Sequence, residues 1–461
     1  MLLSPSDEII LVMTTKISSE EQFNQLRAFR QAIYANFTKA ADCAFELIDA
    51  LLTTPEARSF ADLTTSILFR RGWSSAYKAM QQLIVNKEAL YKLRLDLLPK
   101  DKPLVFAIDA TTLSRATAYT LDDRIFAFTA ADLPGTDNIT AGHCYSTVAY
   151  LAEEKTSWAL PLIQERITSK ETASAKAVEQ IKRVCADLAT SDLLFLLDSG
   201  YANKTLLEMS KDLKVKMVIR WRSNTNLYRL PKEAQSGQKG RKADHGAVFK
   251  INDPTTYGEC AEKIDLVDEK LGAVTVQMWR DLHMEKCKGV NVQLICITQH
   301  KASTKRGRKP LWVIWVGEGM PPLEECWPIY LRRYGIEHWY RFSKQYLFWE
   351  LPKLGTTTQE ENWNELVINA MWMLWLSRGI AEDRRKPWQH VQIKAKMTPG
   401  RVKMGMGVIL AILGTPTKAV KPRGNAPGWE IGRKRKKREI HEVIRRGEQR
   451  KRNKKKELKR A

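Results

Sequence analysis

Residues 104–109 read LVFAID, and residues 193–198 read LLFLLD. Each stretch is a short, continuous apolar run that ends in an aspartate, and such runs are typical of strands buried on both faces of a sheet. In an open α/β sheet, ligands gather beyond the carboxyl ends of the strands. An unpaired carboxylate there costs desolvation free energy. Asp109 and Asp198 are therefore candidate site residues, although either one could instead cap a helix or complete a turn.

Around these two runs the sequence alternates between strand and helix patterns. Helices are predicted at residues 18–52, 60–69, 77–98, 170–189, 205–213, 321–349 and 361–378. Further strands are predicted at residues 144–151, 158–167, 215–220, 274–279, 290–297 and 311–316. The order from residue 104 is three strands, a helix, a strand, a helix and a strand, then an interruption, a further strand and a long helix. That order is typical of an RNase H-like core with an insertion.

The predicted fold class is thus α/β, an RNase H-like catalytic core with a β-rich insertion between helical regions. The predicted domains are a helical N-terminal domain that could bind DNA (1–102), the core (103–220 and 311–350), the β-rich insertion (221–310), a C-terminal helical region (351–420) and a basic disordered tail (421–461). Arg70 and Arg71 in the helical domain are compatible with DNA binding and equally with packing.

A third acid is predicted from the helix at 321–349. Four residues there follow the spacing Y-x2-R-x3-E-x6-K: Tyr330, Arg333, Glu337 and Lys344. At about 100° per residue, all four fall within a stripe about 60° wide and about 21 Å long. An aromatic ring, two cations and a carboxylate make a poor core face and a suitable wall for a site that holds metal and phosphate. The alternative is a solvated charged face with incidental pairing.

The net charge indicates a polyanionic partner. The 461 residues include 75 Lys and Arg against 52 Asp and Glu, a net charge of +23. Residues 433–461 alone carry +12, and the rest of the chain carries +11, so we expect contact with nucleic acid. Seven scattered cysteines without a C-x-x-C pair argue against a disulfide framework and a clustered zinc site. We find no signal peptide and no membrane span, and we expect a cytoplasmic protein.

The sequence resembles the bacterial insertion-sequence transposases of the DDE type, specifically the group marked by a Y-R-E-K signature. The resemblance covers most of the chain. The stretches that carry it are AIDAT at 107–111, LDSGY at 197–201, the signature Tyr330, Arg333, Glu337 and Lys344, RRG at 70–72, TSW at 156–158 and WELPKL at 349–354. In many relatives Arg or Ala follows the second aspartate, whereas this chain has Ser199.

The resemblance implies a mechanism and a set of roles. Asp109, Asp198 and Glu337 are implied as catalytic ligands of two Mg²⁺ or Mn²⁺ ions, which suit carboxylate ligands. Water and then a 3′-OH would attack phosphodiester bonds in one site. The implied DNA contacts come from Tyr330, Arg333 and Lys344. Relatives hold a flipped base with a tryptophan of the β segment, and Trp312 and Trp315 are the nearest candidates. Either one could instead be a core residue.

The predicted function is cut-and-paste DNA transposition: cleavage at the transposon ends and strand transfer into target DNA. The implied partners are the terminal inverted repeats and the target DNA, and we expect a homodimer in the end-paired complex, associated with the bacterial nucleoid. Two alternatives remain open. One is a non-catalytic DNA-binding protein derived from a transposase, and the other is an RNase H-like nuclease that cuts without joining. His143 and His338 are predicted to be structural.

Overall fold

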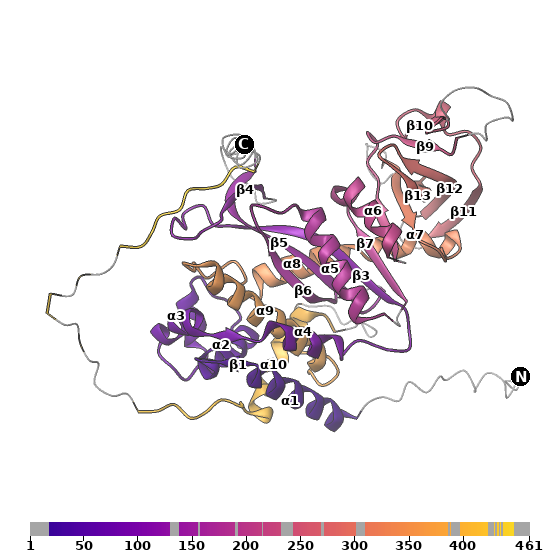
Figure 1. Ribbon diagram of the computed structural model, residues 1–461. Helices are drawn as coiled ribbons and strands as arrows, with labels where there is room; N and C mark the ends of the chain where they lie inside the picture. The colour runs from indigo at the N-terminus through magenta and orange to yellow at the C-terminus, as the bar shows by residue number, and fades with distance from the viewer. Residues whose placement is uncertain are drawn as a thin grey trace, which may run out of the picture.

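The computed structural model describes residues 18–129, 138–154, 157–189, 192–213, 215–231, 243–268, 272–300, 309–385 and 397–422, together with 388, 428, 431–432, 434 and 437–446. Within this part of the chain, one large mixed sheet of twelve strands runs through the molecule, and helices cover it (Figure 1). The described residues thus form a mixed α/β structure, as the sequence predicts.

The N-terminal region folds into helices, with one difference from the prediction. Its elements are α1 (Ser19–Ala35), β1 (Phe37–Thr38), α2 (Ala41–Thr53), the 3₁₀ helix η1 (Phe60–Thr65), α3 (Trp73–Gln82), β2 (Ile84–Val85) and α4 (Lys87–Leu95). The sequence predicts a continuous helix over 18–52, but the chain turns after α1. Lys39 and Ala40 adopt positive φ angles of 47° and 52° there, and β1 pairs with β2.

The helix α9 (Thr357–Ser377) joins the N-terminal helices to the sheet. It is buried on nearly all sides because α1 and α2 pack on one side of it and strand β6 (Ala159–Ile167) packs on another. The helix α10 (Pro399–Leu413) packs against both α2 and α9. The N-terminal and C-terminal helices therefore form one helical layer rather than two separate bodies (Figure 1).

The centre of the sheet has the strand order β6-β5-β3-β7-β8. The strand β3 (Leu104–Ser114) lies antiparallel to β5 (Ile139–Leu151) and parallel to β7 (Leu193–Leu197), which in turn lies parallel to β8 (Lys216–Arg220). The crossovers between the parallel strands are α5 (Ala173–Asp187) and α6 (Lys204–Asp212), with the short 3₁₀ helix η2 (Ser199–Tyr201) between β7 and α6. The strand β4 (Ile125–Phe128) forms the edge beyond β5.

The predicted β-rich insertion is a continuation of the same sheet. Its elements are β9 (Leu227–Arg229), β10 (Val248–Phe249), the 3₁₀ helix η3 (Pro254–Thr256), β11 (Glu262–Asp268), β12 (Gly272–Met284) and β13 (Cys287–Gln299). The strand β14 (Leu311–Val316) lies between β13 and β8 and is antiparallel to both. The insertion is thus hydrogen-bonded through β14 to the strands that carry the candidate aspartates.

The C-terminal tail differs in part from the prediction of disorder. Residues 437–446 lie along the edge strand β4, where Ile444 forms a parallel bridge with Ile125 (Figure 1). Residues 447–461, which the same prediction covers, lie outside the described residues. None of the described helices is long and apolar enough to cross a membrane, and all seven cysteines are free.

Candidate active site

The two candidate aspartates lie side by side on neighbouring parallel strands: Asp109 is in the middle of β3, and Asp198 directly follows the last residue of β7. Ile108 of β3 is in register with Leu197 of β7. Asp109 therefore follows Ile108 at the level where Asp198 follows Leu197, at the end of β7. This arrangement results directly from the two apolar runs, because parallel pairing in register brings their terminal residues together.

The third acid comes from the helix α8 (Tyr334–Gln345), which packs against β3, β5 and β6. Glu337 lies in the first turn of α8. Gly335 allows α8 to approach the sheet closely, because a Cβ at this position would lie 3.0 Å from Leu151 Cδ2. The hydroxyl of Tyr340 donates a 2.8 Å hydrogen bond to the carbonyl of Asp109, which fixes α8 on β3.

Arg333 links the acids electrostatically. Its Nη2 lies 2.7 Å from Glu337 Oε1, and its Nη1 lies 3.9 Å from Asp109 Oδ2. Burial raises the pKa of Asp109 to about 6, opposed by the Ala110 amide and Arg333, and the charges of Asp198 and Glu337 raise it further. The charges of Asp198 and Glu337 thus both act on Asp109, and a shared site of the three acids stays a prediction.

The four signature residues do not lie on one straight helix, which corrects the sequence-based expectation. The chain forms two helices, α7 (Leu323–Leu331) and α8. Pro328 lacks an N–H group, so one hydrogen bond of α7 is missing. The following turn is tightened, since the amides of Arg332 and Arg333 bond to carbonyls three residues earlier. Each such residue turns the chain by about 120° rather than 100°.

Tyr330 lies next to Arg333, whose guanidinium carbon is 5.9 Å from the centre of the Tyr330 ring. The side chain of Tyr330 is only 2% exposed, and its hydroxyl has no hydrogen-bond partner. Burial raises the pKa of Tyr330 to about 12. In this structure Tyr330 is therefore buried beside Arg333, and its contact with DNA stays a prediction.

The two signature cations are held in place by the protein. Arg333 is 5% exposed, and its Nε has no hydrogen-bond partner. Lys344 donates to the carbonyl of Thr112 at 3.1 Å and pairs with Glu350 at 3.0 Å. Lys344 thus lies further along β3 than Asp109, on the same helix as Glu337. The structure brings Arg333 close to the acids and places Lys344 beside them.

Sequence reasoning missed a further cation at this edge of the sheet. Arg220 is the last residue of β8, and its Nη1 lies 3.8 Å from Asp198 Oδ1. The rule that picked out the two aspartates, namely that ligand-binding groups follow parallel strands, applies equally to β8 and could have identified Arg220.

The three carboxylates are chemically suited to bind a divalent cation, although they are not arranged as a complete metal site. Among the described residues, no three His, Cys, Asp or Glu side chains are grouped so that they could hold a metal ion. Asp198 Oδ1 is nevertheless buried without a hydrogen-bond partner. Carboxylate oxygens are the ligands that Mg²⁺ and Mn²⁺ prefer. The unsatisfied oxygen and the raised pKa of Asp109 both indicate a site in which further positive charge is favourable.

Both candidate base-flipping residues are core residues. Trp315 is buried, and its indole donates to the carbonyl of Gly317 at 2.9 Å. Trp312 is buried too, and its ring stacks on Trp279 with centroids 5.7 Å apart. In this structure neither ring is available at the surface for a flipped base, because Trp312 packs against Phe249, Tyr257 and Trp279 of the insertion and Trp315 is 1% exposed.

This placement predicts the effect of Trp312→Phe. We expect the free energy of unfolding to fall by about 1–2 kcal/mol, because the smaller ring loses packing against Trp279. Affinity for DNA is expected to stay unchanged. Chemical denaturation and a DNA-binding titration of the same preparation measure the two quantities, and a selective loss of DNA affinity would restore the base-flipping role.

Three other sequence-based candidates have structural partners. His143 is buried between the carboxylate of Glu360, at 2.7 Å, and the carbonyl of Asp122, at 2.8 Å, as predicted. Arg70 and Arg71 both pair with the buried carboxylate of Glu46. This favours the packing role for the two arginines. His338 is exposed on α8 next to Glu337, so the prediction that it is structural has no support from burial.

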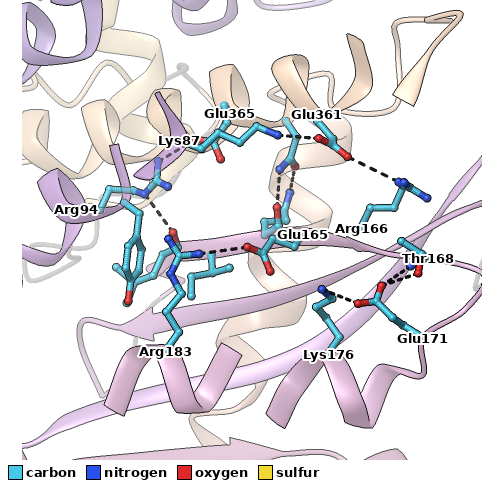
Figure 2. A pocket seen from close by; sticks show the side chains of 15 residues that line it. Lys87, Arg94, Glu165, Arg166, Thr168, Glu171, Lys176, Arg183, Glu361 and Glu365 are labelled. Atoms are coloured by element: carbon cyan, nitrogen blue, oxygen red, sulfur yellow. Dashed lines mark hydrogen bonds and ion pairs between the residues drawn. The ribbon is translucent and has the colours of Figure 1, made fainter. Parts of the chain in front are cut away.

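A charged pocket lies apart from the acids. It has a volume of about 290 Å³ and is lined by residues of α4, β6, α5 and α9 (Figure 2). Its charges neutralise one another: Arg94 pairs with Glu365, Lys87 with Glu361, and Arg183 with Glu165. The pocket is therefore lined by ion pairs between the helical layer and the edge of the sheet. None of the candidate site residues lines it.

Comparison with known families agrees with the geometry. The model of the family described as DDE superfamily endonuclease matches residues 32–286. This match covers more than half of the chain and identifies a nuclease-type enzyme whose substrate is DNA. The chain belongs to the DDE superfamily of endonucleases, and the prediction of a DDE transposase-like protein is confirmed. No curated protein matches the chain.

The family match includes only part of the candidate site. Asp109 and Asp198 lie inside the matched residues, whereas Tyr330, Glu337 and Lys344 lie beyond residue 286. The Y-R-E-K signature therefore stays a prediction, which rests on the spacing and on the position of α8 over β3.

Proposed function

We propose that this protein is a DDE transposase that cleaves DNA at the ends of its element and joins the freed ends to a target. The observation that carries the proposal is the position of Arg333, which pairs with Glu337 and lies 3.9 Å from Asp109, on a strand in register with the strand that Asp198 follows. The order β6-β5-β3-β7-β8, with three antiparallel strands followed by two parallel strands, supports an RNase H-like core. The net charge of +23 supports DNA as the partner.

Asp109, Asp198 and Glu337 are the residues that would hold the divalent cations. When bound, two such ions stabilise the charge that develops on the attacking and leaving oxygens of an in-line displacement. The surrounding residues hold Asp109 and Glu337 in position. Asp109 is held by the Ala110 amide, 2.8 Å from its Oδ1, and by the fixed position of β3. Glu337 is oriented by its ion pair with Arg333.

The nearby cations are suited to hold the DNA backbone. Arg220 is half exposed beside Asp198, and it presents a planar fork that matches a phosphate. Lys344 offers a point charge further along β3. These cations hold the scissile strand against the acids, and Tyr330 supports Arg333 from below through the ring contact between them. Pairing of two transposon ends calls for two copies of the chain in the active complex.

A plasmid that carries the gene with its flanking DNA tests the proposal. With Mg²⁺ or Mn²⁺, a transposase releases the element and joins a 3′-OH end to a second plasmid. Cleavage without joined products would instead favour an RNase H-like nuclease. Binding without either product would favour a non-catalytic DNA-binding protein, and the proposal would then fail.

A further inference from the structure

The C-terminal tail is attached to the edge of the catalytic sheet by a series of contacts. The amide of His441 donates to the carbonyl of Tyr119 at 2.9 Å, and that of Ile444 donates to the carbonyl of Arg124 at 2.8 Å. The buried guanidinium of Arg124 donates back to the carbonyl of His441 at 2.9 Å. Arg446 reaches the carbonyl of Thr168 at 3.3 Å. Residues 437–446, here called the tail anchor, are thus attached beside β4, with one isolated bridge between Ile444 and Ile125.

Three arginines of the tail anchor have no carboxylate partner in the part of the chain that the structure describes. Among the described residues, Arg438, Arg445 and Arg446 form no ion pair with a carboxylate. Arg445 instead lies over the ring of Phe126, 5.6 Å from its centroid. Phe126 is 46% exposed, and its neighbour Phe128 is 66% exposed. Arginines without a carboxylate partner on an exposed surface are suited to contacts with DNA phosphates.

Strand register places this surface on the catalytic face of the sheet. Thr147 of β5 pairs with Asp109, and Ala141 of β5 pairs with Phe126. Six positions separate the two β5 residues, and side chains alternate between the faces, so Phe126 and Asp109 point to the same side. Six residues of strand span about 20 Å, the length of about six base pairs of duplex DNA. Arg445 therefore lies about 20 Å from Asp109 on the same side of the sheet, beyond the part of that side that Trp349 and Glu360 cover.

We propose that the tail anchor forms an accessory binding surface for duplex DNA on the catalytic face, with Arg445 on Phe126 as its central contact. The inference rests on the proposed function, because that function supplies DNA as the partner. The anchor also fixes where the remaining basic residues start. Residues 447–461 lie outside the described residues, and their sequence has eight Lys and Arg against two Glu. Phosphate contacts of this kind raise affinity for DNA of any sequence.

Two isoleucines of the anchor allow a matched test. Ile444 contacts β4, whereas Ile440 is 75% exposed. The full-length Ile444→Asp and Ile440→Asp variants carry the same change of charge in the same segment. Binding is measured by fluorescence anisotropy with a duplex of about 30 base pairs of random sequence in EDTA. No strand is cut without divalent ions, so the result is independent of whether the protein cleaves or joins DNA.

We expect Ile440→Asp to bind like the wild type and Ile444→Asp to bind about fivefold or more weakly, because a released anchor no longer holds its cations on the DNA face. We also expect Arg445→Ala to reduce the salt dependence of log K by about one unit of slope. Hydrogen exchange at the amides of His441 and Ile444 reports whether Ile444→Asp releases the anchor.

Three results would overturn the inference. In the first, the anchor is released in Ile444→Asp but this variant binds DNA like Ile440→Asp. In the second, the anchor stays protected in Ile444→Asp and Arg445→Ala leaves the salt slope unchanged. In the third, deletion of residues 437–461 leaves affinity and slope at wild-type values. Loss of cleavage in a variant of the acids with intact binding would count against neither the anchor nor its DNA contact.

Discussion

Asp109→Asn lowers the rate of DNA cleavage by about a thousandfold or more, because loss of a metal ligand removes several kcal/mol of charge stabilisation. Asp198→Asn and Glu337→Gln are expected to have effects of the same order. The three residues act as a unit, so combining the substitutions adds little further loss. The measurement is the initial rate of strand cleavage with Mg²⁺ on the DNA that encloses the gene.

The matched control is Glu325→Gln. Glu325 is an exposed carboxylate on α7, close in sequence to Glu337 and outside the cluster of acids. We expect this variant to cleave DNA at the wild-type rate. Equal cleavage by the Asp109→Asn variant and the wild type, at equal thermal stability, would show that the acids are not the catalytic site.

Glu360→Ala lowers the free energy of unfolding by about 3–5 kcal/mol, because it leaves buried cationic and polar groups without their partner. Glu360 of α9 accepts from Arg115 and, at 2.7 Å, from His143. Through these bonds it connects α9 to β3 and β5, the strands beneath the acids. Urea denaturation measures the change. The adjacent Glu361→Ala is the control, since its ion pair with Lys87 is partly exposed and is expected to contribute less than about 1 kcal/mol.

The contribution of Glu360 also depends on pH. Burial would raise the pKa of Glu360, but the hydrogen bond from His143 and the charge of Arg115 hold it below the ordinary value. A carboxyl group whose pKa is lowered by folding stabilises the folded state fully above its unfolded pKa. The stabilisation is lost as the pH falls through the lower folded value. We therefore expect the difference between the wild type and Glu360→Gln to shrink below about pH 4.5. A difference that stayed constant into acid would contradict the buried ion pair.

The central strands could be predicted from sequence because burial on both faces leaves a continuous apolar run. The predictions for 193–197 and 311–316 agree with β7 and β14 to the residue. The same pattern located Asp109 and Asp198, since parallel pairing in register brings the ends of such runs together. Glu337 was found by spacing, and α8 indeed carries it to β3.

Other features depend on tertiary contacts, which the spacing of apolar residues along the sequence does not reveal. The helix at 321–349 has one continuous pattern, yet Pro328 and the tightened turn after it divide α7 from α8 and bury Tyr330. Trp312 and Trp315 are candidates from their place in the sequence alone, and only the tertiary packing shows that both rings are buried. The tail is predicted to be disordered, because its pairing with β4, which is far away in the sequence, leaves no pattern in the tail's own residues.

Binding of Mn²⁺ tests the central claim, that the three acids form one metal site, most directly. Electron paramagnetic resonance of free Mn²⁺ in a titration of the wild type and of the Asp109→Asn, Asp198→Asn and Glu337→Gln variants measures this binding without DNA or turnover. The account predicts saturable binding of about two ions to the wild type. Each single variant is expected to bind at least about tenfold more weakly, because it loses one carboxylate ligand. Mn²⁺ affinity equal to that of the wild type in all three variants would contradict the account.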